Sequence, residues 1–264
     1  MTLRLAALNI YPIKATHGIA LAESEVDGFG LRYDRRWMVV DGAGQFLSQR
    51  SHARLALVVS SVQGDQLRVN GPGMPTLEVP LHPSSAVTTR VAVWDDLCSA
   101  SWVGQEAAEW FSEFLGCPCS LVHMAEDTVR PADPVFAPSG SRVSFADGFP
   151  FLLISEESLA DLNRRLAQPL PMNRFRPNLV VAGGQPYDED LWTRLEIGAI
   201  EFQVVKPCGR CVVTTTDQTT GERGKEPLHT LATYRKRAGE VMFGQNVLHQ
   251  GPGRLRVGDP VILR

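Results

Sequence analysis

Residues 206–217, KPCGRCVVTTTD, bring two thiols to the junction of two predicted strands. The β-branched run that follows the second thiol predicts the second of these strands. A thiolate is the form of cysteine that acts as a nucleophile or binds a soft metal, and Lys206 and Arg210 would favour it electrostatically. Cys208 and Cys211 are therefore candidate reactive residues; the alternative is that both are small buried hydrophobic residues.

The spacing of these thiols, C-x-x-C, also suits a thioredoxin-like redox site or half of a zinc site. A thioredoxin site expects a helix to start at the thiols, whereas here a β-branched run follows. A zinc site needs two further ligands, and Cys117 and Cys119 are a poorly spaced second half. We predict that Cys98, Cys117 and Cys119 are packing residues, and the six scattered histidines form no H-E-x-x-H pair.

The composition is that of an ordinary globular protein, with 264 residues, a formal net charge of −3 and 44% hydrophobic residues. This near-neutral balance removes the usual electrostatic reason to expect binding to a nucleic-acid duplex. No run approaches the roughly 18 to 20 apolar residues that span a bilayer, and the N-terminus lacks a signal-peptide pattern. The odd number of cysteines, five, argues against a disulfide framework. We therefore expect a cytoplasmic protein with reduced thiols and no membrane span.

Short apolar runs separated by turn residues extend on both sides of the thiol segment. They predict a hairpin around residues 41–44, a last hairpin around 257–260, and strands at 55–62, 66–69, 76–81, 151–154, 178–182, 195–197 and 200–206. Apolar residues at helical spacing predict helices at 107–115 and 155–167, and a short helix at 228–237. Strands outnumber helices without regular βαβ alternation, so the predicted class is α+β, β-rich and barrel-like, with a few helices.

Three separated segments each place a cation beside a rigid or aromatic residue near a strand end. They are YPIK at 11–14, DRRW at 34–37 and FRPN at 175–178. Such cations suit the anionic group of a small molecule. The alternative is a solvated charge or a structural ion pair. No G-x-G-x-x-G, G-x-x-x-x-G-K-[ST] or G-x-S-x-G motif supports a dinucleotide, P-loop or α/β-hydrolase site.

Taken in order, these segments resemble the MOSC-domain proteins, a family named after the C-terminal domain of molybdenum cofactor sulfurase. The resemblance spans nearly the whole chain and rests on YPIK at 11–14, GLRYDRRWMVVD at 30–41, PFLLISEESLADLN at 150–163, RFRPNLVVAG at 174–183, CGRCVVTTTDQTTGE at 208–222, KEPLHTLATYRK at 225–236, FGQNV at 243–247 and VGDPV at 257–261. It implies an N-terminal β-rich domain, residues 1–120, packed on a MOSC-type β-barrel domain, residues 121–264.

The nearest branch of this family resembles the amidoxime-reducing and bacterial hydroxylaminopurine-reducing proteins, which bind a molybdopterin-type molybdenum cofactor. In that branch the cysteine before the threonine run ligates molybdenum, which implies the same role for Cys211; soft thiolate ligation is chemically sensible. Cys208 matches a position that lines the cofactor pocket. The cofactor has a phosphate and a polar pterin, which suit cations, amides and backbone donors. The further contacts that the resemblance implies are Lys14, Arg35, Asp147, Gly148, Arg176, Asn178, Arg210 and Asn246.

Some positions depart from the family pattern or carry two interpretations. Ala15, Ala146 and Phe149 stand where close relatives have small hydroxyl residues, which bears on individual hydrogen bonds and not on the cofactor itself. Asp217 is a candidate catalytic residue near the metal, or simply a turn-former ahead of residues 219–221. No unambiguous general acid is visible in the sequence.

The resemblance implies a molybdenum-dependent oxidoreductase that reduces amidoximes, hydroxylamines or N-hydroxylated nucleobases, with the cofactor supplying the redox chemistry. The chain ends after the last MOSC segment and has no plant-type C-x₄-C-x₂-C pattern. We therefore expect electrons from a separate iron–sulfur, haem or flavin protein, and no need for pyridoxal phosphate. The alternative class is a molybdenum cofactor carrier or sulfur-transfer protein that uses Cys211 as a persulfide or cofactor ligand.

Overall fold

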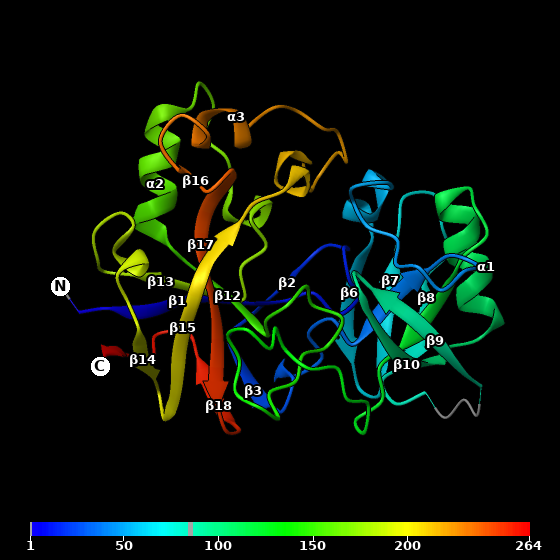
Figure 1. Ribbon diagram of the computed structural model, residues 1–264. Coiled ribbons are helices and arrows are strands. Elements are labelled where there is room, and N and C mark those ends of the chain that lie inside the picture. The colour runs from blue at the N-terminus through cyan, green and yellow to red at the C-terminus, as the bar shows by residue number, and fades with distance from the viewer. Residues whose placement is uncertain (1, 84–86) are drawn as a thin grey trace.

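Two groups of elements lie side by side in the computed structural model, which describes residues 2–83 and 87–264 (Figure 1). One group holds the largest sheet, with α2 (Glu156–Arg165) and α3 (Leu228–Leu231) near one end. The other holds smaller sheets and α1 (Gln105–Leu115). Strands predominate and the described helices are few, so the predicted β-rich α+β class is confirmed.

The largest sheet combines strands from both ends of the chain. Its spatial order is β19 (Val261–Leu263), β14 (Arg194–Ile197), β15 (Ile200–Gly209), β17 (Glu240–Gln250), β12 (Phe151–Ser155), β13 (Leu179–Ala182), β1 (Arg4–Ile10) and β2 (Ile19–Leu21), with β16 (Lys236–Arg237) on β17. The first strand of the chain, β1, pairs antiparallel with β13. The division at residue 120 stays a prediction, but strands from before it complete the sheet that follows it.

Three smaller sheets complete the strand inventory of the described residues. A four-stranded sheet has the order β5 (Trp37–Val40), β11 (Ser120–His123), β10 (Asp96–Trp102) and β9 (Thr88–Val93). The two three-stranded sheets are β18 (Gly253–Arg256), β3 (Glu23–Asp27) and β4 (Gly30–Leu31), and β6 (Val59–Gln63), β7 (Gln66–Asn70) and β8 (Leu77–Pro80).

The two longer helices form for the reasons that the sequence indicates. Trp110, Phe111 and Phe114 make the buried stripe of α1, and the helix ends at Gly116 in the left-handed conformation. In α2 the Ser155 hydroxyl caps the N-terminus by accepting a hydrogen bond from the backbone N–H of Ser158.

Four local predictions are wrong at this level. The threonine run is the 3₁₀-helix η4 (Val212–Thr215) instead of a strand, because the hydroxyls of Thr214 and Thr215 donate to backbone carbonyls three residues back. The start of the predicted strand at 55–62 is the 3₁₀-helix η1 (Ala53–Leu57). The helix expected at 228–237 ends at residue 231. The turn at 257–260 joins no hairpin, because β18 pairs with β3 whereas β19 pairs with β14.

The remaining 3₁₀-helices of the described residues are η2 (Met172–Arg174) and η3 (Asp188–Asp190).

Irregular pairing between β15 and β17 shapes the end of the sheet that carries the thiols. The register shifts twice, between Val204 and Lys206 and again between Pro207 and Gly209. Such bulges bend a strand and re-aim its side chains, and they tolerate a proline. On the other side of β17, Gly244 has φ +80° and a Cβ there would lie 2.8 Å from the carbonyl oxygen of Leu153. Only glycine lets β17 approach β12 this closely.

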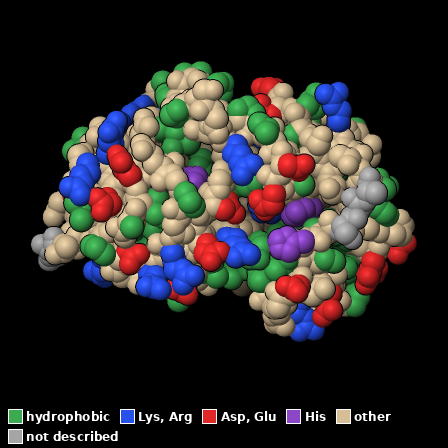
Figure 2. All heavy atoms as spheres, turned by 90° about the horizontal axis from the view of Figure 1, so that it is seen from below, with side chains coloured by type: hydrophobic (Ala, Val, Ile, Leu, Met, Phe, Trp, Pro, Cys, Tyr) green, Lys and Arg blue, Asp and Glu red, His purple; other side chains and the backbone are tan. Residues whose placement is uncertain are grey.

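The surface shows mixed charge. On the face in Figure 2, basic and acidic side chains of the described residues are interspersed and form no broad patch of one sign. In the described part of the chain, no helix is both long enough and apolar enough to cross a bilayer.

Candidate active site

A cavity of about 180 Å³ lies beside the end of β15, and segments far apart in the sequence meet around it. Ten of the eleven candidate residues from the sequence line it, and Asp217 does not. The ten are Lys14, Arg35, Asp147, Gly148, Arg176, Asn178, Cys208, Arg210, Cys211 and Asn246. Their roles toward a cofactor stay predictions, but they share one site.

Lys14 is a buried cation in the wall of this cavity. Its Nζ donates to the carbonyl oxygen of Phe145 at 2.7 Å and to Oδ1 of Asp147 at 2.6 Å. Burial lowers the pKa of Lys14, and the neighbouring carboxylate partly offsets this effect. Desolvation by the cavity wall would raise the pKa of Asp147, whose side chain is nevertheless exposed, but the charge and hydrogen bond of Lys14 outweigh it and hold that pKa well below its usual range. Asp147 therefore holds Lys14 in place and is a poor partner for an anion.

Arg35 is held by two protein side chains. Its Nη1 donates to Oδ2 of Asp34 and to Oδ1 of Asn178, the latter at 3.2 Å. The Asn178 amide makes further bonds, because Nδ2 donates to the carbonyl of Asn9 at 3.1 Å and Oδ1 also accepts from the N–H of Leu152. Asn178 therefore helps to position Arg35, and its contact with a cofactor stays a prediction.

Two arginines in the cavity wall each have a buried N–H group without a hydrogen-bond partner among the described residues. Among the described residues, Nη2 of Arg176 and Nε of Arg210 have no hydrogen-bond partner. Other groups of the two side chains are bonded, because Nη1 of Arg176 donates to the carbonyl of Thr16 at 2.6 Å and Nη2 of Arg210 donates to that of Phe175 at 2.7 Å. Burial lowers the pKa of Arg176 to about 10, so it remains charged near neutral pH. A buried donor left unpaired costs about 1–3 kcal/mol, which a polar or anionic ligand would remove.

The two thiols have different surroundings. Arg210 donates from Nη1 to Sγ of Cys208 at 3.0 Å. Cys211 is half-buried at the start of η4, and in the described part of the chain its Sγ has no hydrogen bond. Lys206 does not line the cavity, and its Nζ lies 3.5 Å from Oδ2 of Asp133. Cys211 is the thiol left available to a ligand.

Backbone strain is concentrated around this cavity. Ala15, Arg35 and Arg176 line it and have φ of 70°, 51° and 57°, in the left-handed region that non-glycine residues seldom adopt. Each such residue costs of order 1–3 kcal/mol and persists only where the surrounding structure fixes it, typically at functional sites. The strain supports a functional role for this cavity independently of its charge.

Phe46, Ser48 and Arg50 also line the cavity, and sequence reasoning missed them. Beside them, Trp94 donates from Nε1 to Oδ1 of Asp147 at 3.1 Å, and the Arg50 guanidinium lies 4.3 Å from the Trp94 ring centroid. Trp94 opens the two-residue turn between β9 and β10 with φ 58°. Such turns favour Asn-Gly, so the unusual tryptophan in this turn is the sequence feature that could have marked Trp94 as part of a functional site.

Asp217 lies outside the cavity and shapes a turn. Its Oδ1 accepts from the backbone N–H of Thr219 at 2.8 Å and from that of Thr220 at 3.2 Å, and Oδ2 lies 3.5 Å from Arg174. The N–H of Thr219 is the main cause that lowers the pKa of Asp217. These contacts match the turn-forming interpretation of this residue.

We expect Asp217→Ala to lower the free energy of unfolding by about 1 kcal/mol or less, because the carboxylate is partly exposed, and to leave turnover per bound molybdenum unchanged. The folded-state pKa is lowered, so its stabilisation is present above the unfolded pKa of about 4 and is lost as pH falls through the folded pKa. Urea unfolding at pH 7 and pH 3 checks this prediction. The difference in the free energy of unfolding between wild type and variant should be smaller at pH 3 than at pH 7. A large fall in turnover per molybdenum would instead restore the catalytic interpretation.

The donor set fits the molybdopterin-type cofactor that the sequence implies. Buried cations, the unpaired Nε–H of Arg210 and a free thiol belong to residues that line one cavity. Ala15, Ala146 and Phe149 line it without a hydroxyl group, so these positions offer a cofactor no side-chain hydrogen bond. No group of three or more His, Cys, Asp and Glu side chains within residues 2–83 and 87–264 is placed to hold a metal ion, which leaves the zinc alternative without ligands.

Two family models match successive parts of the chain, whereas the largest sheet combines strands from both parts. Residues 2–118 match the model of the MOSC N-terminal beta barrel domain, and residues 140–262 match that of the MOSC domain. The chain is 36% identical to human mitochondrial amidoxime-reducing component 1 over 279 residues, which is 98% of this chain and 82% of the human protein. The chain belongs to the MOSC-domain family.

Two further relatives place this MOSC-domain protein within the family. It is 37% identical to rat mitochondrial amidoxime reducing component 2, covering 96% of this chain and 80% of the rat protein. It is also 33% identical to molybdenum cofactor sulfurase of Oryza sativa subsp. japonica over 92% of this chain, but spans only 32% of that longer protein. Of these three relatives, the two that match over most of their own length are amidoxime-reducing components.

Proposed function

We propose that this MOSC-domain protein is a molybdenum-cofactor-dependent oxidoreductase that reduces N-hydroxylated compounds: amidoximes, hydroxylamines or N-hydroxylated nucleobases. The observation that carries the proposal is the cavity beside β15, which buried cations and the available thiol of Cys211 line together. The similarity to amidoxime-reducing components over most of both chains supports the reaction class. A location in the cytoplasm stays a prediction.

The residues of the cavity have distinct roles in this proposal. Arg210 would give its unpaired Nε–H to the phosphate or pterin of the cofactor, and Arg176 and Lys14 would each add a buried positive charge. Cys211 would ligate the metal, and Cys208 would be kept from it by its hydrogen bond with Arg210. When bound, the cofactor supplies the two-electron redox chemistry that the side chains lack. Electrons would come from a separate iron–sulfur, haem or flavin protein.

The test measures molybdenum content and turnover on the same preparation. We expect about one molybdenum per chain, and reduction of benzamidoxime to benzamidine with reduced methyl viologen as the electron source. Full molybdenum loading without turnover of benzamidoxime, an aliphatic hydroxylamine or a hydroxylaminopurine would favour the second candidate, a cofactor carrier or sulfur-transfer protein. The similarity to the rice sulfurase keeps that candidate in view.

Neutralising the buried cation should weaken cofactor retention. We expect Lys14→Met to cost about 1–3 kcal/mol of cofactor binding, because it removes a buried charged donor, so that molybdenum is lost during dialysis. Lys236→Met, at an exposed position, is the matched control and should retain wild-type molybdenum. Equal molybdenum retention by the two variants, measured by mass spectrometry, would contradict a role for Lys14 in the cofactor site.

A further inference from the structure

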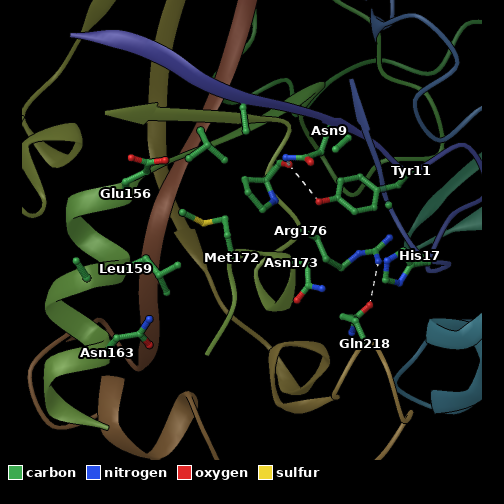
Figure 3. A pocket seen from close by; sticks show the side chains of 16 residues that line it. Asn9, Tyr11, His17, Glu156, Leu159, Asn163, Met172, Asn173, Arg176 and Gln218 are labelled. Carbon is green, nitrogen blue, oxygen red and sulfur yellow. Dashed lines mark hydrogen bonds between the residues drawn. The ribbon is translucent and has the colours of Figure 1, made fainter. Parts of the chain in front are cut away.

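A second and larger cavity, of about 460 Å³, lies between α2 and the segment that follows β1 (Figure 3). Arg176 lines both this second cavity and the candidate cofactor site, while Lys14, Arg35, Cys208 and Cys211 line only the latter. The proposed function leaves this space unexplained. Its volume lies in the range of ordinary small-molecule sites.

One end of the second cavity gathers hydrogen-bond donors. Arg176, His17, Asn173 and Gln218 come together there, on the opposite side from α2 (Figure 3). Arg176 is only 8% exposed, and its Nη2 has no partner among the described residues. The side chains of His17 and Asn173 also make no hydrogen bond within the part of the chain that the structure describes.

The rest of the second cavity is mainly apolar. Leu159 and Met172 project into it from α2 and η2 (Figure 3), and Ala160 and Val180 also line it. Glu156 lies on the α2 side, away from Arg176, and is its one acidic lining residue among those described. A ligand with a single anionic group would therefore place that group near Arg176 and keep an uncharged body toward α2.

We propose that the second cavity is a binding site for a small amphiphilic monocarboxylate. The carboxylate would accept hydrogen bonds from Arg176 and Asn173, and the apolar body would lie along Leu159 and Met172. A carboxylate suits a guanidinium better than a neutral acceptor does, because charge-assisted hydrogen bonds are about twice as strong. A dianion is disfavoured because its second charge would lie near Glu156 or on apolar side chains.

Isothermal titration calorimetry on the full chain as purified tests the proposal with octanoate as the probe. We expect saturable binding at one site per chain. Acetate, which has the head group alone, and octylamine, which has the same body with a reversed charge, should each bind at least about tenfold more weakly. Octylamine binding as tight as octanoate binding, or no saturable heat with octanoate, would overturn the proposal.

Three variants separate this site from non-specific adsorption. Ala160→Phe, at an exposed position of α2 that lines the second cavity, should abolish octanoate binding by filling the space. Asn173→Asp should weaken it about tenfold or more by placing a like charge beside the carboxylate. Ala43→Phe makes the same substitution as the first variant at an exposed position outside the cavity and should bind octanoate as wild type does. Unchanged binding in both Ala160→Phe and Asn173→Asp would place the octanoate elsewhere and reject the site.

Discussion

Cys211→Ala should reduce turnover of N-hydroxylated substrates by more than about a hundredfold, while leaving the fold intact. Removal of a group that only supports a metal ligand typically costs 10- to 100-fold, and loss of the ligand itself should cost more. The side chain is small and half-buried and its thiol bonds to no described residue, so little packing is lost. Turnover with reduced methyl viologen and thermal unfolding by circular dichroism measure the two effects.

Cys208→Ala is the matched control for this prediction, because it removes the same atoms from the same cavity. Its Sγ is held by Arg210, so we expect this variant to retain molybdenum and partial activity. The fold should be equally stable in both variants. Full activity of Cys211→Ala with the cofactor bound would reject Cys211 as the metal ligand, and loss of activity in Cys208→Ala alone would exchange the two assignments.

Regular elements of this chain could be predicted because they depend on local patterns. The stripe of Trp110, Phe111 and Phe114 and the apolar spacing in residues 155–167 each indicate a helix within a single segment, although packing of the apolar face supplies most of its stability. The threonine run was misassigned because β-branched residues favour strands, whereas here hydroxyl groups bond to nearby carbonyls and tighten the backbone. Whether strand pairing or these local hydrogen bonds prevail depends on the tertiary surroundings of the segment, which its sequence does not show.

The candidate site was predictable in its membership but not in its internal contacts. The motif resemblance placed Lys14, Arg35 and Arg176 in one site, and no residue spacing alone would have brought them together. The sequence did not show that Arg210 faces Cys208 or that Asn178 serves Arg35. Left-handed backbone at non-glycine residues has no clear sequence signal, and neither does a cavity assembled from separate segments.

The second large expected effect is the dependence of turnover on the electron donor. The chain as purified should contain molybdenum but no iron, and should turn over with an artificial reductant but not with reduced nicotinamide alone. A nicotinamide delivers a hydride, and conversion to single electrons needs a flavin or similar group, for which the sequence shows no dinucleotide fingerprint. Addition of a flavin reductase with a small iron–sulfur or haem carrier should restore nicotinamide-driven turnover from near zero.

The salt dependence of that restored reaction tests whether charge steers the encounter. Charges of both signs are interspersed on the described surface in Figure 2, and redox partners usually meet through small, transient interfaces. If complementary charges guide docking, the rate with the carrier should fall as salt rises, since the Debye length shrinks to about 10 Å at 0.1 M. The rate with methyl viologen on the same preparation is the control, because it needs no protein docking and should change much less. Turnover with reduced nicotinamide by the iron-free chain alone would contradict the need for a separate electron carrier and would reveal a cofactor site within this chain.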